Sequence, residues 1–222
     1  AVQHFSLAIH NEDLFLMTTS ASNNSGSNDF FQLEVLTPQK FIKNAHVQLQ
    51  TGSGNNNNFL LPGFSTFLCS VESCIYIFNG NYGGNKKLNV DHSLLFKIAC
   101  SDFLSVKTLQ PIALNKQHTA NLPSFRKHAT LFYNSNRHSL FLFGGVSSIE
   151  SSPPLDLSDL WEFKLANSTW SRIIPLNHIF AFSTPRRQYA VATDKTGDRL
   201  FIHGGIFSSS LENNNNNNNN NN

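Results

Sequence analysis

The chain repeats a short pattern of apolar and polar positions four times. A largely apolar run ends in a pair of small residues at 14–19, 75–80, 140–145 and 200–205. Each run follows a polar turn, and the turns follow earlier apolar stretches at 5–9, 66–69, 129–133 and 189–193. Two short apolar runs around a polar turn are typical of a β-hairpin, so the pattern predicts four hairpins.

Two further strands are expected after each of the first three hairpins. Apolar and polar residues alternate at 28–35, 92–98 and 159–165, which favours a strand with one buried side. A fourth strand is expected at Trp170 to Ile174, at Leu104 to Leu109, and, in the first copy, at Phe41 or at Val47 to Leu49. Because no stretch shows a sustained helical period, the predicted fold class is all-β, with four strands per repeat.

A unit of four strands that repeats about every 60 residues predicts the blade of a β-propeller. The third copy reads Arg126-Lys-His128, Leu140-Phe-Leu-Phe-Gly-Gly145, Asp159-Leu-Trp-Glu-Phe163 and then Trp170. This pattern resembles a kelch repeat. The fourth copy matches it at Pro185-Arg-Arg-Gln-Tyr189 and at Gly204 and Gly205. The second copy keeps Gly80 beside Asn79, and the first has Thr18 and Thr19 in place of the glycine pair.

The resemblance implies a partial kelch-type β-propeller of about three and a half four-stranded blades. The blades are expected at about 4–51, 63–110, 124–176 and 185–212, within one domain at 1–212. Kelch propellers usually close with about six or seven blades, so we expect the chain to be part of a longer propeller, truncated at both ends. The asparagine run at 213–222 is expected to be a solvated low-complexity segment, of a kind that resembles tracts in amoebae and fungi.

The repeat signature also assigns structural roles to single residues. A glycine pair would end the second strand near the central axis, where side chains would crowd, and glycine permits a positive φ. By the resemblance, the tryptophans of the motif pack between neighbouring blades. The structural motif residues are Gly80, Gly144, Gly145, Asp159, Trp161, Trp170, Gly204 and Gly205. His203 takes a position that Phe holds in copies two and three, so we expect it to be buried. Arg126-Lys127 and Arg186-Arg187 fall at matching repeat positions, which favours a structural role over a basic patch.

The strand order places the long connections on one face of the predicted propeller. They are 20–28, 81–91 and 146–158, after the second strand, and 52–63, 111–123 and 175–185, before the next hairpin. Variable loops on a rigid scaffold typically bind a partner. The alternative is that the loops are merely tolerated, since a long loop costs little entropy. The candidate binding residues on this face are Asn81, Tyr82, Lys86 and Lys87, although the same loop could be only a flexible tip.

The composition and the motifs of the chain argue against several classes of function. Only 14% of the residues are charged and the net charge is +2, so no basic field is available to attract nucleic acid. No apolar run approaches the roughly 18 residues of a membrane helix, so we expect no membrane insertion within this chain. No catalytic motif or metal-ligand spacing occurs, and we expect no cofactor. The resemblance therefore implies a scaffold or adaptor for protein–protein interaction, whose partner is another protein.

Two alternatives to a cytoplasmic scaffold remain open. Galactose oxidases share the propeller and use copper with Tyr and His ligands, but the chain has only four Tyr, three of them in expected strands. The chain could instead be the ectodomain of a membrane-anchored fungal kelch protein. Cys69 and Cys74 flank a turn, and a disulfide between them would imply an oxidising compartment. We favour two buried thiols and a cytoplasmic location.

Overall fold

The computed structural model describes residues 2–10, 13–20, 31–37, 40–47, 65–69, 74–78, 92–99, 110–114, 122–124, 126–147, 155–175 and 184–206. These residues form antiparallel β-sheets and turns and contain no helix, so the described part of the chain is all-β, as predicted. Accordingly, none of it is a helix long and apolar enough to cross a membrane. The loop at 81–91 and the asparagine run at 213–222 lie outside the described residues.

The strands group into four antiparallel sheets, each made of strands that follow one another in the chain. We name the sheets units 1 to 4. Unit 1 contains β1 (Val2–His10), β2 (Asp13–Ser20), β3 (Phe31–Thr37) and β4 (Lys40–Val47). Unit 2 contains β5 (Ser65–Cys69), β6 (Cys74–Phe78), β7 (His92–Ala99) and β8 (Gln110–Ala113). Unit 3 contains β9 (Arg126–Lys127), β10 (Thr130–Asn134), β11 (Ser139–Ser147), β12 (Asp156–Lys164) and β13 (Thr169–Ile173). Unit 4 is the hairpin of β14 (Ala190–Thr193) and β15 (Leu200–His203).

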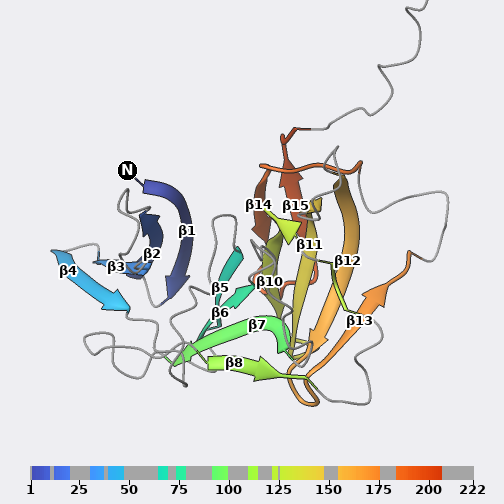
Figure 1. The fold of residues 1–222 in the computed structure, drawn as a ribbon, viewed down its shortest axis with the longest axis horizontal. Helices are drawn as coiled ribbons and strands as arrows, with labels where there is room; N and C mark the ends of the chain where they lie inside the picture. The colour runs from blue at the N-terminus through green and yellow to red at the C-terminus, as the bar shows by residue number, and fades with distance from the viewer. Residues whose placement is uncertain are drawn as a thin grey trace, which may run out of the picture.

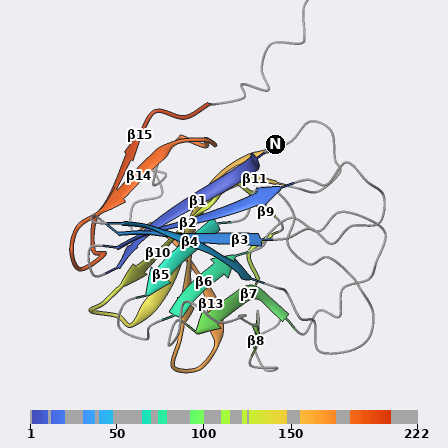
Figure 2. The same ribbon diagram turned by 90° about the vertical axis from the view of Figure 1, so that its left-hand side faces the viewer.

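The first long strands of successive units lie next to one another. β1 contacts β5, and β5 contacts β10. Figure 1 shows these three strands toward the middle of the molecule, with the last strands β4, β8 and β13 at the outside. The same three strands are neighbours in the turned view of Figure 2. The first strands of units 1 to 3 therefore lie side by side, and the last strands of these units lie at the outside.

The described part of the last strand of unit 2 lies just after its expected position. We expected it at Leu104 to Leu109, but the strand that pairs with β7 is β8 (Gln110–Ala113), and residues 101–109 are outside the described part. The expected strand stopped before this part because Pro111 reads as a strand breaker in the sequence. A proline lacks the N–H that a central strand must donate, but at the edge of a sheet that loss is tolerated. β8 is such an edge strand.

Unit 3 is packed on both sides because its side chains alternate between two neighbours. Leu140 and Leu142 of β11 belong to a core cluster shared with unit 2, whereas Phe141 and Phe143 belong to a second cluster shared with unit 4. Successive side chains of a strand point to opposite faces, so one strand supplies both cores. The nine residues of β11 are consequently almost all buried.

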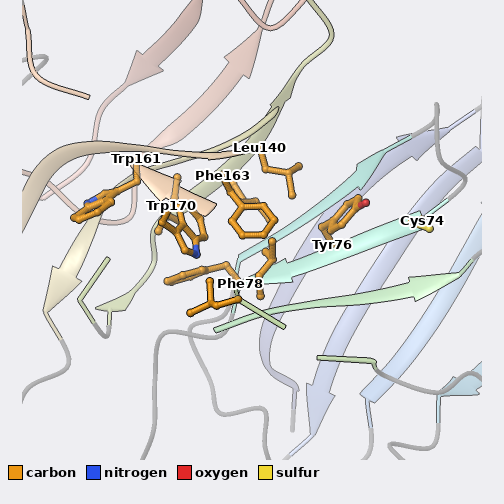
Figure 3. Packing of buried hydrophobic residues seen from close by; sticks show 11 residues of the cluster. Cys74, Tyr76, Phe78, Leu140, Trp161, Phe163 and Trp170 are labelled. Carbon is orange, nitrogen blue, oxygen red and sulfur yellow. The ribbon is translucent and has the colours of Figure 1, made fainter. Parts of the chain in front are cut away.

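Aromatic rings fill the core between units 2 and 3. Trp170 meets Phe163 with ring centroids 5.0 Å apart and meets Phe78 of unit 2 edge-on at 6.1 Å. Figure 3 shows these rings, together with Tyr76 of unit 2, between the two sheets. Trp161 is also buried in this cluster. Each such ring buries a large apolar area, and edge-to-face pairs add further attraction, so these contacts hold the two units together.

Units 3 and 4 are also joined through their hairpin turns. The side-chain amide of Asn134 donates to Asp198 Oδ1 at 2.7 Å and to the Gly197 carbonyl at 3.1 Å. Asn136 donates to the other carboxylate oxygen of Asp198 at 2.6 Å. The Asn134 bond is the main reason that the pKa of Asp198 lies below its ordinary value. A Cβ on Gly197 would come within 2.0 Å of the Tyr133 carbonyl, so the turns meet backbone to backbone.

His203 is exposed, and the expectation that it would be buried was wrong. Phe143, at the matching place in unit 3, is buried because it packs against Tyr189 of unit 4. His203 points to the side of unit 4 that faces away from unit 3, where the described residues provide no further sheet. The repeat position determines the face of the sheet on which the side chain lies. Whether the side chain is buried depends on a neighbouring unit that covers this face.

Two equivalent phenylalanines test this account of packing. Phe141 is 6% exposed and Phe201, at the same repeat position of unit 4, is 55% exposed. We expect Phe141→Ala to lower the free energy of unfolding by about 3–5 kcal/mol, since it leaves a cavity beside the stacked Phe132 ring. Phe201→Ala should cost less than about 1 kcal/mol. Urea unfolding of both variants measures the difference, and equal losses would contradict the arrangement of units 3 and 4.

Candidate functional site

The candidate site is the end of units 3 and 4 from which the long connections leave. In units 3 and 4, a short segment before the first long strand pairs with residues that follow the second long strand or end it. Lys127 pairs with Val146 of β11, and Arg187 pairs in the same way with Ile206. The residue after each of the basic pairs, His128 and Gln188, has a φ of 55°. We call this repeated segment the arginine lead-in, Ser124–His128 in unit 3 and Thr184–Gln188 in unit 4.

The guanidinium of Arg126 holds the lead-in of unit 3 to two strands. Its Nη1 and Nη2 lie 2.5 and 2.9 Å from the two carboxylate oxygens of Asp159 on β12. Nη1 also donates to the Gly144 carbonyl on β11 at 3.2 Å. Nε and Nη2 donate to the carbonyl and hydroxyl of Ser124, both at 3.1 Å. Arg126 is 1% exposed, so its charge is neutralised by a fork-to-fork pair and its donors are satisfied.

Trp161 completes this network. Its Nε1 donates to Asp159 Oδ2 at 2.6 Å, two residues along the same strand. Burial of the Asp159 carboxyl raises its pKa, but the hydrogen bond and charge of Arg126, with the Trp161 bond, outweigh burial and lower the pKa below 3.8. Asp159 is therefore held as a carboxylate. The Asp-Leu-Trp motif thus has a direct physical reason: the aspartate receives the arginine, and the indole is both a donor and a core ring.

In unit 4 the arginine makes the same hydrogen bonds but has no carboxylate partner among the described residues. Arg186 Nε donates to the Thr184 carbonyl at 3.2 Å, Nη1 donates to the Gly204 carbonyl at 3.0 Å, and Nη2 donates to the Thr184 hydroxyl. These bonds match those of Arg126 to Ser124 and Gly144. No carboxylate within the described ranges forms an ion pair with Arg186. Its guanidinium is therefore an oriented cation near the face of the long connections.

The neighbouring basic residue of unit 4 instead ties two units together. Arg187 Nη1 lies 2.9 Å from Asp156 Oδ1, at the start of β12 in unit 3. Tyr189 donates its hydroxyl to the Phe143 carbonyl of unit 3 at 2.8 Å, and burial raises the pKa of Tyr189 to about 12. These contacts hold unit 4 against unit 3 next to the candidate site. Together with the bonds of Arg126, they give Arg126, Arg187 and Tyr189 structural roles.

The glycine pairs lie at the same end of units 3 and 4, where neighbouring segments approach the backbone closely. Gly144 and Gly145 have φ of 61° and 92°, and Gly204 and Gly205 have φ of 70° and 96°. A Cβ on Gly145 would meet the Lys127 carbonyl at 2.6 Å, so the second glycine makes room for the lead-in. A Cβ on Gly144 would meet the Tyr189 hydroxyl at 2.8 Å, whereas nothing lies within 4 Å of that position on Gly204.

Several residues singled out in the sequence lie elsewhere or outside the described part. Gly80 and the binding candidates Asn81, Tyr82, Lys86 and Lys87 are outside it. Cys69 and Cys74 are opposite each other in the ladder of β5 and β6, and Cys74 is a buried thiol.

The described contacts do not assemble a metal centre. Tyr133 and His138 form a 2.7 Å hydrogen bond, but at the hairpin turn, away from the long connections. Within the described residues no three His, Cys, Asp or Glu side chains are grouped so that they could hold a metal ion.

The feature that sequence reasoning missed is the difference between Arg126 and Arg186. Both arginines follow the same pattern, a hydroxyl residue two positions before the arginine and a glycine carbonyl eighteen positions after it. The sequence signal was the aspartate. The third copy has Asp159 before its aromatic residue, and no such motif follows Gly205 in the sequence. The lack of a carboxylate partner for Arg186 among the described residues could therefore have been anticipated.

The chain matches no known protein-family model, and a comparison with curated proteins finds no match either. Among solved structures it is similar to a chain of the "Cryo-EM structure of RAG in complex with one melted RSS and one unmelted RSS". The TM-score is 0.54 and the sequence identity is 16% over 95% of this chain and 60% of that chain. The chain thus spans less than two thirds of the matched structure. At this identity the likeness concerns the fold alone.

The pKa of Asp159 predicts a pH dependence of stability. Because the folded-state pKa lies below 3.8, the pair stabilises the fold above that pH, and this contribution is lost as the pH falls through the folded-state pKa. Asp159→Asn should cost about 3–5 kcal/mol at about pH 6, because it leaves Arg126 buried without its counter-ion. Urea unfolding at about pH 6 and about pH 3 should show the gap between the two proteins narrowing in acid. A pH-independent gap would contradict this role.

The glycine pairs give a matched test of crowding. Gly204→Ala should lower the free energy of unfolding by about 1–2 kcal/mol, because only its positive φ is strained. Gly144→Ala carries the same strain and also pushes its Cβ against the Tyr189 hydroxyl. Its loss in urea unfolding should therefore be clearly larger. Equal losses would mean that the Tyr189 side chain moves away from the new Cβ with no loss of stability, and would contradict the crowding.

Proposed function

We propose that this chain forms part of a kelch-type β-propeller that acts as a protein-interaction scaffold. The observation that carries the proposal is the repetition of the units: the first strands of units 1 to 3 adjoin one another, and units 3 and 4 carry the same arginine lead-in and glycine pair. A closed ring of such sheets is a rigid support for loops.

The binding surface that we propose is the face of the long connections. The arginine lead-ins, the glycine pairs and the start of β12 all lie at this end in units 3 and 4, where ion pairs fix the strands. Loops that leave a braced framework can vary in sequence without loss of the fold, which suits recognition. Asn81, Tyr82, Lys86 and Lys87 belong to one such connection in the sequence.

Lysine cross-linking tests which face meets a partner. In cells that express the natural full-length protein, we expect partner peptides to be cross-linked to Lys86 and Lys87 on the long connection. Lys164 and Lys195 are exposed near the opposite end and provide internal controls. Mass spectrometry identifies both the partner and the site.

A variant then measures the contribution of the loop. The purified partner should bind the Tyr82→Ala, Lys86→Glu, Lys87→Glu triple variant roughly tenfold more weakly or worse, as removal of contact residues predicts. The Lys195→Glu variant should bind unchanged. Cross-links confined to Lys164 and Lys195, or equal binding by the triple variant, would contradict the proposed face.

A further inference from the structure

The turn between β12 and β13 contains an acceptor sequence for a covalent modification. Residues 167–169 read Asn-Ser-Thr, the tripeptide in which an asparagine accepts an N-linked glycan. A second such tripeptide, at 23–25, lies outside the described residues. In a chain this rich in asparagine the tripeptide arises easily by chance, so the surroundings of Asn167 decide its meaning.

The tripeptide lies at an outer corner of unit 3. β13 is the edge strand of its sheet, and Figure 1 shows it at the outside of the molecule. Ser168 has a φ of 54° and donates its N–H to the Lys164 carbonyl at 2.9 Å, so the chain reverses direction tightly. The side chain of Asn167 is exposed on this turn. A bulky polar group attached there extends into solvent, as glycosylation requires.

The threonine of the tripeptide is bound to the asparagine. The Thr169 hydroxyl donates to Asn167 Oδ1 at 2.7 Å. This bond fixes the orientation of the side-chain amide through its oxygen. The nitrogen Nδ2, which is the atom that takes the sugar, makes no hydrogen bond to any other described residue. The turn therefore presents an oriented amide whose reactive atom is not used by the fold.

Two other asparagines at a hairpin turn lack this arrangement. Asn134 is buried, and its Nδ2 donates to Asp198 Oδ1 and to the Gly197 carbonyl. Asn136 Nδ2 donates to the other carboxylate oxygen of Asp198. Both amides thus hold unit 4 against unit 3. Of these three turn asparagines, only Asn167 combines an exposed side chain with an Nδ2 that the fold leaves available.

We propose that Asn167 is the acceptor of an N-linked glycan. The donor is a lipid-pyrophosphate-linked oligosaccharide, and the catalyst is a membrane-bound oligosaccharyltransferase of the secretory pathway. Asn167 Nδ2 forms a bond to the anomeric carbon of the first sugar, while the bond from that carbon to the pyrophosphate oxygen breaks. The amide nitrogen loses one proton to a base of the transferase. The lipid pyrophosphate leaves with the electron pair of the broken bond.

The register of two cysteines agrees with the compartment that this modification needs. N-linked glycans are added in the secretory pathway, where disulfides also form. Cys69 and Cys74 pair directly across the ladder of β5 and β6. Opposite residues of antiparallel strands have Cα atoms about 4.5–5.5 Å apart, within the roughly 4.4–6.8 Å that a disulfide spans. A glycan at Asn167 places the chain outside the cytoplasm, in contrast to the location expected from the sequence.

The glycan lies at the end of unit 3 opposite the long connections. Lys164, the last residue of β12, pairs with both Ser139 and Thr169, so the two hairpin turns of unit 3 share one end. The arginine lead-in pairs with the other end of β11. A glycan at Asn167 therefore leaves the proposed loop face uncovered, and the inference does not depend on the proposed function.

Peptide mapping of the natural full-length protein tests the site. The protein is purified from its own cells, digested with trypsin and treated with peptide N-glycosidase in heavy-oxygen water, which converts a glycosylated asparagine to a labelled aspartate. The peptide 165–172, which follows Lys164 and ends at Arg172, should carry the label. The peptide 128–137 contains Asn134 and Asn136 outside any acceptor tripeptide, so it is a control in the same digest and should stay unlabelled.

Two variants expressed in the same cells test the role of the hydroxyl. Thr169→Ala should lose the label at Asn167, because the acceptor sequence requires a hydroxyl residue two positions on. Thr169→Ser retains that hydroxyl and should remain labelled. The pair separates the need for the hydroxyl from a mere need for the threonine side chain in the turn.

Three results would overturn the inference: an unlabelled peptide 165–172 from the natural protein, label that appears without the glycosidase, or full labelling of Thr169→Ala. None of them bears on the cross-linking test of the loop face, because that test uses the opposite end of the units. Conversely, a failure of the loop-face test leaves the assignment of Asn167 unaffected.

Discussion

The ion pair between Arg126 and Asp159 is the constraint on which the architecture of unit 3 depends. One guanidinium reaches the lead-in through Ser124, β11 through the Gly144 carbonyl and β12 through Asp159. A buried ion pair is not a large net gain in stability, because both charges lose their hydration. Its value here is geometric, since this arrangement of the three segments satisfies all the donors of Arg126. We infer that the pair selects the register of the sheet more than it strengthens it.

Alternation along the strands determines how one unit holds the next. Because β11 faces two neighbours, its residues divide into a leucine set toward unit 2 and a phenylalanine set toward unit 4. Unit 3 therefore shares one core cluster with unit 2 and another with unit 4, as expected of repeat proteins. The exposure of Phe201 and Ile206 follows directly, because the outer side of unit 4 meets no further sheet among the described residues.

Much of this arrangement could be predicted from the sequence, for physical reasons. The hairpins were found because alternating apolar residues and short polar turns are local signals, and the all-β class followed. The pairing of residues 110–113 was not predicted, because Pro111 signals a break in the sequence. A proline is tolerated at the edge of a sheet, and an edge position is a property of the sheet that the sequence does not contain. His203 was misjudged because burial depends on a neighbouring unit. The role of Arg126 needed the pairing of β11 with β12, which no local pattern contains.

The two ends of the units are held by different means, and this difference bears on function. At the hairpin turns, Gly197 lies against the Tyr133 carbonyl and Asp198 is bound by two asparagines of unit 3, so these turns are parts of the unit interface. A change of length or sequence there would disturb the packing of two sheets. At the other end, Arg126 and Arg187 brace the strands beneath the connections. This framework of ion pairs in units 3 and 4 is the reason that we place the proposed recognition surface at that end.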